Sequence, residues 1–163
     1  MAKVLVVYYS RSGNTEKMAN LVAEGARTEG VDGEIKKVVD TTPEDLLSAD
    51  GIIVGSPTYY GLPAAEIKAL FDESVKHHGR LSGKVGGAFS SAANIGGGNE
   101  TTILAMLQMM LIHGMVVQGT AEGDHYGPVA INAPDDRSTP QCRALGKRVA
   151  ELVAKLAMAG PWE

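Results

Sequence analysis

A short run rich in hydroxyl side chains has the composition of a phosphate-binding loop. It consists of Ser10, Arg11, Ser12, Gly13, Asn14 and Thr15, and it joins an apolar segment at residues 3–9 to an amphipathic helical pattern. A helix start offers unpaired backbone N–H groups and the positive end of a dipole. Hydroxyls add donors, glycine permits positive φ, and the arginine attracts a phosphate dianion. A simpler interpretation, an ordinary corner with Asn14 or Thr15 as the helix N-cap, stays open.

Two familiar phosphate motifs are missing from this segment. The sequence has no G-x-G-x-x-G here, which argues against a Rossmann dinucleotide cradle. It also has no G-x-x-x-x-G-K-[ST], which argues against a nucleoside triphosphatase loop. A mononucleotide is therefore the simplest ligand for the site.

Two further loops suit a flat ring. The first follows the apolar run 49–55 and places adjacent aromatic rings between prolines; its candidate residues are Pro57, Thr58, Tyr59, Tyr60 and Gly61. The second follows the glycine-rich run 84–90; its candidates are Ser90, Ser91, Ala92, Ala93, Asn94, Gly96, Gly97 and Gly98. Aromatic faces suit a conjugated ring, and small residues let the backbone lie against one. Ordinary aromatic packing and a flexible loop are the simpler interpretations.

The pattern along the chain predicts strands that alternate with helices. Strands are expected at residues 3–9, 33–39, 49–55, 84–90 and 115–118. Helices are expected at residues 15–29, 43–48, 63–79 and 101–113, and from Ser138 onward with Gln141 in a capping box, while residues 121–136 have loop composition. This alternation predicts an α/β fold, a parallel sheet covered on both faces, in one domain of residues 1–163. Ligands of such sheets bind beyond the carboxyl ends of the strands, where all three loops fall.

Composition excludes several function classes. A net charge of -4 without a Lys/Arg cluster argues against nucleic-acid binding. The longest apolar stretch, residues 103–117, contains Gln108 and His113 and is too short to span a membrane. A single cysteine, Cys142, fits a reducing compartment, and the chain begins with no signal-peptide pattern. We therefore expect a cytoplasmic protein with small-molecule ligands and no membrane or nucleic-acid partner.

Flavin mononucleotide (FMN) fits the three loops because it joins a phosphate to a broad tricyclic ring. A one-electron carrier uses nearby carboxylates to disfavour the anionic, fully reduced flavin. Residues 56–65 and 86–99 carry no charge, and the nearest later carboxylates are Glu122 and Asp124. The net charge is also mild for a carrier with an acidic docking face. The sequence therefore favours a two-electron enzyme, with an electron carrier and a non-catalytic flavin-binding regulatory protein as alternatives.

Four segments carry a resemblance to a known family. They are Ser10-Arg11-Ser12-Gly13-Asn14-Thr15, Gly55-Ser56-Pro57-Thr58-Tyr59-Tyr60-Gly61, Phe89-Ser90-Ser91 with the glycine run through Ile103, and His113-Gly114-Met115-Val116. Together they resemble the tryptophan-repressor-binding-protein (WrbA) type of NAD(P)H:quinone oxidoreductase in the flavodoxin-like superfamily. The resemblance implies bound FMN, a doubly wound five-stranded sheet in the order 2-1-3-4-5, two-electron quinone reduction by a nicotinamide, and a homodimer or homotetramer. The chain is shorter than typical members, and residues 121–136 look reduced.

Two histidines are candidates for roles near the flavin. His113 is the candidate proton donor or substrate orienter, because histidine titrates near neutral pH. The alternative for His113 is a helix-terminal histidine favoured by the dipole. His125, in the later loop, is expected to contact the ring or the substrate. The mechanism expected is ping-pong: the nicotinamide gives a hydride to the flavin and leaves, and a quinone then takes its place.

Overall fold

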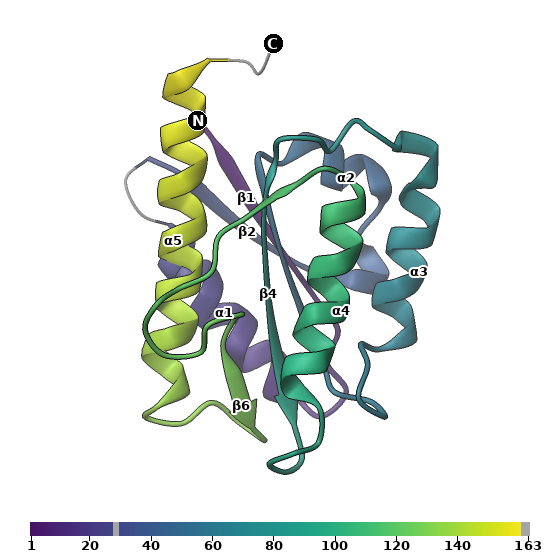
Figure 1. The fold of residues 1–163 in the computed structure, drawn as a ribbon, viewed down its shortest axis with the longest axis vertical. Coiled ribbons are helices and arrows are strands. Elements are labelled where there is room, and N and C mark those ends of the chain that lie inside the picture. The colour runs from purple at the N-terminus through teal and green to yellow at the C-terminus, as the bar shows by residue number, and fades with distance from the viewer. Residues whose placement is uncertain (28–29, 161–163) are drawn as a thin grey trace.

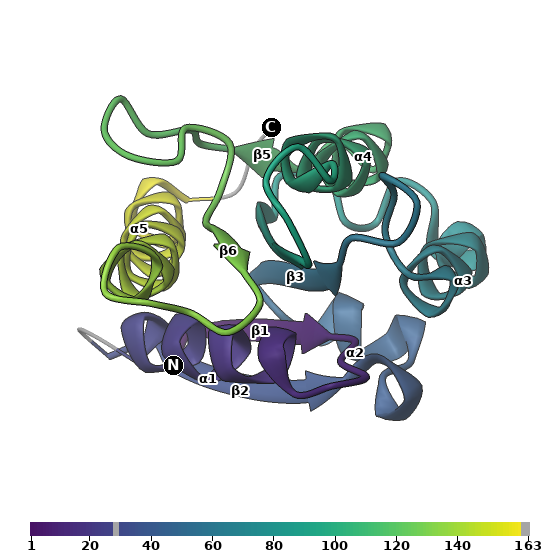
Figure 2. The same cartoon turned by 90° about the horizontal axis from the view of Figure 1, so that it is seen from below.

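A six-stranded parallel sheet forms the centre of the molecule in the computed structural model, which describes residues 1–27 and 30–160 (Figures 1 and 2). The strands pair in the order β2-β1-β3-β4-β5, and β6 also pairs with β4. Their bounds are β1 (Lys3–Tyr8), β2 (Asp32–Lys37), β3 (Gly51–Pro57), β4 (Val85–Ala92), β5 (Val116–Val117) and β6 (Val129–Ile131). The predicted fold class and strand order are confirmed.

Helices cover both faces of the sheet. Figure 2 shows α1 (Asn14–Ala26) and α5 (Ser138–Ala159) on one side of the sheet, and α2 (Pro43–Ser48), α3 (Ala65–Glu73) and α4 (Asn99–Ile112) on the other. The short 3-10 helices are η1 (Val38–Asp40) and η2 (Ser74–His77). Within β1, Val4 and Val6 join the core under α1 and α5, whereas Leu5 and Val7 join the core under α3 and α4. The run is apolar without alternation because both faces of the strand are buried.

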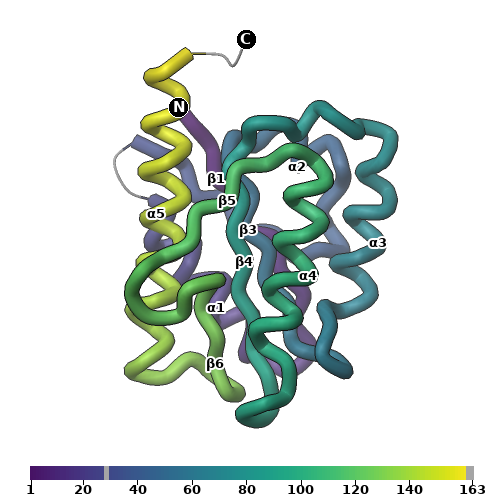
Figure 3. The backbone as a smooth tube through the Cα atoms, viewed as in Figure 1, coloured from purple at the N-terminus to yellow at the C-terminus, as the bar shows by residue number. Residues whose placement is uncertain are grey.

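The fifth strand position is divided into two pieces. Val116 and Val117 pair with the beginning of β4, and Val129, Ala130 and Ile131 pair with its end. Residues 118–128 leave the sheet between the two pieces and pass beside α5 (Figure 3). The expectation of loop throughout residues 121–136 is therefore wrong at β6, whose three residues are too few to give a recognisable period.

Helix starts differ from expectation where glycine or a carboxylate acts as the cap. The N-cap of α1 is Gly13, not Asn14 or Thr15, and no side chain caps that helix. The capping box predicted for Ser138 with Gln141 is wrong. Asp135 takes that role, since its carboxylate accepts the Ser138 N–H (2.8 Å) and its own N–H donates to the Ser138 hydroxyl (2.9 Å). The last two residues of the helix predicted at 15–29 lie outside the described residues.

All three candidate loops meet at one edge of the sheet. In Figure 1, β1 begins at the top beside the N label, so the carboxyl ends of the parallel strands lie at the bottom. The loops after β1, β3 and β4 are therefore at the bottom, together with the end of β6. The connection from α4 to β5 lies at the opposite edge.

Candidate functional site

The loop after β1 forms an open helix N-terminus. Gly13 has φ of +94°, a conformation that few residues other than glycine adopt, and its N–H donates to the Ser10 hydroxyl (3.1 Å). The side chains of Arg11, Ser12 and Asn14 have no hydrogen bond or ion pair with the residues that the structure describes. The first turn of α1 and these side chains can therefore direct their donors to an anion.

The loop after β3 is a tight hairpin with one strained residue. Tyr59 and Leu62 exchange two backbone hydrogen bonds (2.9 and 3.1 Å) around Tyr60 and Gly61. The φ of Tyr60 is +51°, which is uncommon for a bulky side chain, and the ring is fully exposed. The ring of Tyr59 packs edge-on against Tyr9, with centroids 6.2 Å apart. Strain of this kind concentrates at binding sites, so the hairpin is a candidate ligand contact.

The hairpin is fixed to the two elements that flank the third loop, the end of β4 and the start of α4. At its base, the Thr58 N–H donates to the Ser91 carbonyl (2.7 Å), and the hydroxyls of Thr58 and Ser90 are 2.8 Å apart. At its tip, the Thr101 hydroxyl is 2.9 Å from the carbonyl of Gly61. These contacts hold the second and third loops as one unit.

A positive φ and a close contact explain why one of the three consecutive glycines, Gly98, is a glycine. Its φ is +108°, and a Cβ placed there would lie 2.7 Å from the Cα of Gly61 and 3.0 Å from the Thr101 hydroxyl. Any larger residue would push the hairpin away from the loop. Gly98 is also the N-cap of α4, which, like α1, has no side-chain cap.

A cavity of about 280 Å³ opens where the three loops meet. Eleven of the predicted cofactor-binding residues line it: Ser10, Arg11, Ser12, Asn14, Thr15, Pro57, Thr58, Tyr59, Ser91, Ala92 and Ala93. The structure thus brings together residues that lie more than 80 positions apart in the sequence. Hereafter this cavity and its lining are called the cradle.

Asn132 also lines the cradle, although it was not among the predicted binding residues. It follows β6, and its φ of +60° lies in the left-handed region, which asparagine adopts more readily than most residues. Its carbonyl accepts the Ser91 hydroxyl (2.7 Å) and its N–H donates to the Ala92 carbonyl (2.8 Å). An asparagine directly after a short Val-Ala-Ile run was the available signal, but the strand itself was not recognised.

The other predicted binding residues surround the cradle without lining it. They are Gly13 within the first loop, the buried Ser90, and residues of the other two loops: Tyr60, Gly61, Asn94, Gly96, Gly97 and Gly98. His125 lies apart from them. It lines a separate cavity of about 200 Å³ with Glu100 and Tyr126, and its Nδ1 is 2.9 Å from the Thr120 carbonyl.

The structure does not bring His113 to the cradle. His113 is the C-cap of α4 and precedes β5. The connection from α4 to β5 lies at the sheet edge opposite the three loops (Figure 3), and the eight-residue β4 separates the two edges by about 25 Å. The Ser74 hydroxyl donates to the Phe71 carbonyl (2.7 Å), so it accepts from His113 Nε2 (2.8 Å). The buried Nδ1 has no partner among the described residues. Burial, aided by His78, lowers the pKa of His113, so the ring is a neutral structural group within its own chain.

The cradle has almost no charge. Of the described residues that line it, Arg11 is the only one with an ionised side chain, and no carboxylate is among them. The single positive charge lies in the first loop, beside the open start of α1. The lining therefore suits a ligand with one anionic end and a neutral body.

Comparison with known proteins agrees with this geometry. The family described as NADPH-dependent FMN reductase matches residues 36–124. The chain is also 45% identical to a flavodoxin from Aquifex aeolicus, over 94% of its own length and 88% of that protein. The chain belongs to the NADPH-dependent FMN reductase family. It is 34% identical to a protein named NAD(P)H dehydrogenase (quinone) from Archaeoglobus fulgidus, over 96% of its own length and 100% of that relative.

A solved structure supports the same membership. The WrbA-like flavodoxin from Agrobacterium tumefaciens superposes with a TM-score of 0.80 at 28% identity, covering 95% of this chain and 99% of the other. The resemblance inferred from the four sequence segments is confirmed. The protein is an FMN-dependent flavodoxin-like oxidoreductase. Among the described residues, no helix is both long and apolar enough to cross a membrane.

Proposed function

We propose that the protein is an FMN-dependent NAD(P)H:quinone oxidoreductase and that the cradle holds its cofactor. The chemistry that bound FMN supplies is hydride transfer between a nicotinamide and an electron acceptor. The residues fit this group because the uncapped start of α1, the Arg11 charge and the free Ser12 hydroxyl lie together at the first loop. The hairpin and third loop add an aromatic wall at Tyr59 and a backbone wall at Ala92–Ala93.

Each part of the chain has a distinct task in this proposal. The first loop binds the phosphate through backbone N–H groups, hydroxyls and Arg11. The hairpin and the third loop orient the ring, and the Thr101–Gly61 hydrogen bond keeps them at a fixed separation. The exposed ring of Tyr60 beside the cradle offers a surface on which a planar nicotinamide or quinone can stack.

The observation that carries the proposal is the lack of carboxylates in the cradle. A carboxylate beside the ring would destabilise the anionic, fully reduced flavin and favour one-electron transfer. A neutral lining leaves that form undisturbed, which suits two-electron chemistry. We also propose that the nicotinamide and the quinone would bind in turn, in the ping-pong order expected of flavin-mediated hydride transfer.

Steady-state kinetics test this proposal. FMN-saturated protein is expected to oxidise NADPH or NADH with benzoquinone as acceptor, and double-reciprocal plots at several benzoquinone concentrations should be parallel. Arg11→Gln should weaken FMN retention because Arg11 carries the only ionised side chain among the described residues that line the cradle. No turnover by the FMN-saturated protein, or intersecting plots, would contradict the enzyme or the ping-pong order respectively.

One observation favours a second candidate, a flavodoxin-type electron carrier: the 45% identity to the Aquifex aeolicus flavodoxin. A redox titration separates the candidates. A carrier gives two well-separated one-electron steps and no turnover with benzoquinone. The proposed enzyme gives turnover and a single two-electron step.

An oligomer remains a prediction from the resemblance. Val75 and Ile112 are exposed apolar side chains that line one surface cavity together, from η2 and α4. The role predicted for His113 could operate only if a second chain carried it to the cradle, since its own chain holds it at the far edge. Light scattering coupled to size-exclusion chromatography measures the mass, and His113→Gln should leave turnover unchanged if the active unit is a monomer.

A further inference from the structure

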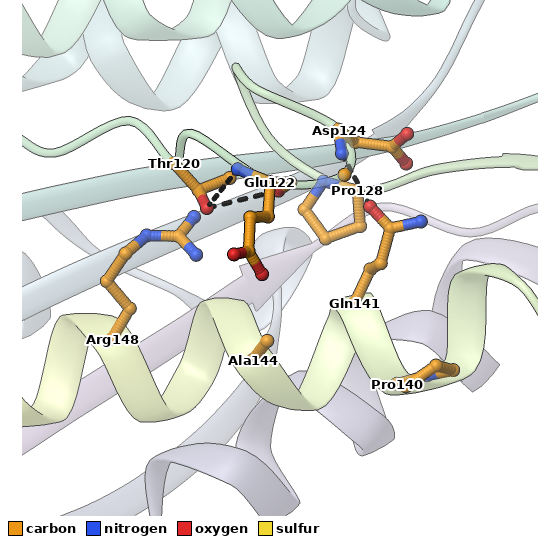
Figure 4. Close-up of a pocket in the computed structure, with 9 residues that line it drawn as sticks. Thr120, Glu122, Asp124, Pro128, Pro140, Gln141, Ala144 and Arg148 are labelled. Atoms are coloured by element: carbon orange, nitrogen blue, oxygen red, sulfur yellow. Dashed lines mark hydrogen bonds between the residues drawn. The ribbon is translucent and has the colours of Figure 1, made fainter.

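A second cavity, separate from the cradle, lies between residues 118–128 and α5 (Figure 4). Its volume is about 290 Å³, and none of its lining residues lines the cradle. The loop supplies one wall and the helix the other; the lining residues are Thr120, Glu122, Gly123, Asp124, Pro128, Pro140, Gln141, Ala144 and Arg148. The proposed quinone reductase chemistry uses none of these residues.

Arg148 is an unsatisfied cation in this cavity. Its Nε is buried without a hydrogen-bond partner, and the side chain has no ion pair with the described part of the chain. Figure 4 shows the guanidinium reaching from α5 toward Thr120 along one side of the cavity. Arg148 is partly buried, and a buried Nε–H without an acceptor is unfavourable; burial accordingly lowers the pKa of Arg148. An anion in the cavity would satisfy it.

Three other polar side chains of the lining, those of Thr120, Asp124 and Gln141, are already engaged. The Asp124 carboxylate is paired with Arg137 (2.9 Å) and accepts the Val129 N–H (2.9 Å). The Gln141 side chain accepts the Asp124 N–H (2.6 Å). The Thr120 hydroxyl is bonded to the backbone of Glu122. These groups therefore cannot neutralise Arg148, and they hold the loop in place around the cavity.

Glu122 limits the charge of any ligand. Its carboxylate lines the same cavity and has no side-chain partner among the described residues. It would repel a second negative charge on a ligand, which disfavours a phosphate dianion. Pro128, Pro140 and Ala144 supply the apolar part of the lining. The volume suits a molecule at the small end of typical ligands.

We propose that this cavity is a binding site for a small monocarboxylate with an apolar body. The carboxylate pairs with the Arg148 guanidinium, whose planar fork matches a carboxylate in two parallel hydrogen bonds. The apolar body lies against the two prolines and Ala144. The site adds to the flavin chemistry and does not depend on the acceptor that the flavin reduces.

Calorimetric titration of the full chain with benzoate tests the site, with the cradle first saturated with FMN so that it cannot take up the anion. Benzoate should bind the native chain, and Arg148→Gln should weaken binding about tenfold or more. Arg143→Gln is the matched control, because Arg143 lies on the same helix, is exposed and pairs with Glu24. Its affinity should equal that of the native chain, and inorganic phosphate should bind more weakly than benzoate.

Native-chain NMR keeps the test independent of variant folding, since benzoate should shift the side-chain Nε–H signal of Arg148. No benzoate binding, equal binding by Arg148→Gln, phosphate binding as tight as benzoate, or an unmoved Arg148 signal would each overturn the proposal. Binding that appears only in Glu122→Gln would also overturn it, because Glu122 itself would then be the occupant of the site.

Discussion

Gly13→Ala is a sharp test of the phosphate loop, because the change adds one methyl group and no clash. A Cβ at Gly13 meets no atom within 4 Å, so the only penalty is the φ of +94°. A non-glycine residue in this region is destabilised by about 1–2 kcal/mol. The loop of the free protein can relax to avoid the strain, but it must return to this conformation to bind the phosphate. The affinity for FMN should therefore fall by about 5- to 30-fold.

Gly79→Ala is the matched control for this prediction. Gly79 has φ of +84°, its Cβ would also meet no atom within 4 Å, and it follows η2 rather than any cradle loop. Gly79→Ala should unfold at a temperature lower by about 2–8 °C for a chain of this size, whereas Gly13→Ala should lower the unfolding temperature by less, because its free loop can relax. Titration followed by quenching of flavin fluorescence should show weaker binding for Gly13→Ala alone. Equal affinities for the two variants would refute the assignment of the first loop.

Three further changes have defined outcomes. Tyr60→Gly should raise the unfolding temperature by removing strain worth about 1–3 kcal/mol, while kcat/KM for benzoquinone falls; an unchanged kcat/KM would remove Tyr60 from the site. Burial raises the pKa of Cys142 to about 12, so Ellman's reagent at about pH 8 should label the thiol only after the protein unfolds. Rapid labelling of the folded protein would contradict the burial of Cys142. Hydrogen bonds from Lys76 and His77 lower the pKa of Glu44 to about 2, so its stabilisation is present above about pH 4.5 and is lost as the pH falls toward 2. Glu44→Gln should flatten that part of the stability curve in acid unfolding, and an unchanged curve would show that the contact is not formed in solution.

The sequence predicted the cradle well because its residues are contiguous in three loops. Each loop follows a buried strand, and parallel strands place their carboxyl ends at one edge, so the loops after β1, β3 and β4 had to meet. Asn132 was missed because β6 pairs with β4 through only three residues and has no period of its own. A strand this short is defined by its pairing with a neighbouring strand, and the local sequence does not show that pairing.

The same limit applies to side chains that act over a distance. His113 was a reasonable candidate by type, but its position after α4 puts it at the edge where strands begin. Gln141 fits a capping box by spacing, yet it reaches across to the backbone of Asp124, and Asp135 caps the helix instead. The sequence did not indicate Arg148 as a binding residue, because neighbouring residues in the sequence do not show that an arginine lacks a partner in the fold.

The division of the fifth strand has a consequence for how copies of this chain can associate. The edge strands on one side of the sheet are the two short strands β5 and β6, which residues 118–128 separate. The edge strand on the other side is β2, which carries the charged residues Asp32, Glu34, Lys36 and Lys37. Edge strands that are short or charged resist pairing with a strand of another chain. Such pairing leads to aggregation and fibril formation. Copies of this chain should therefore meet through helices and loops, and the sheet itself should stay closed to extension.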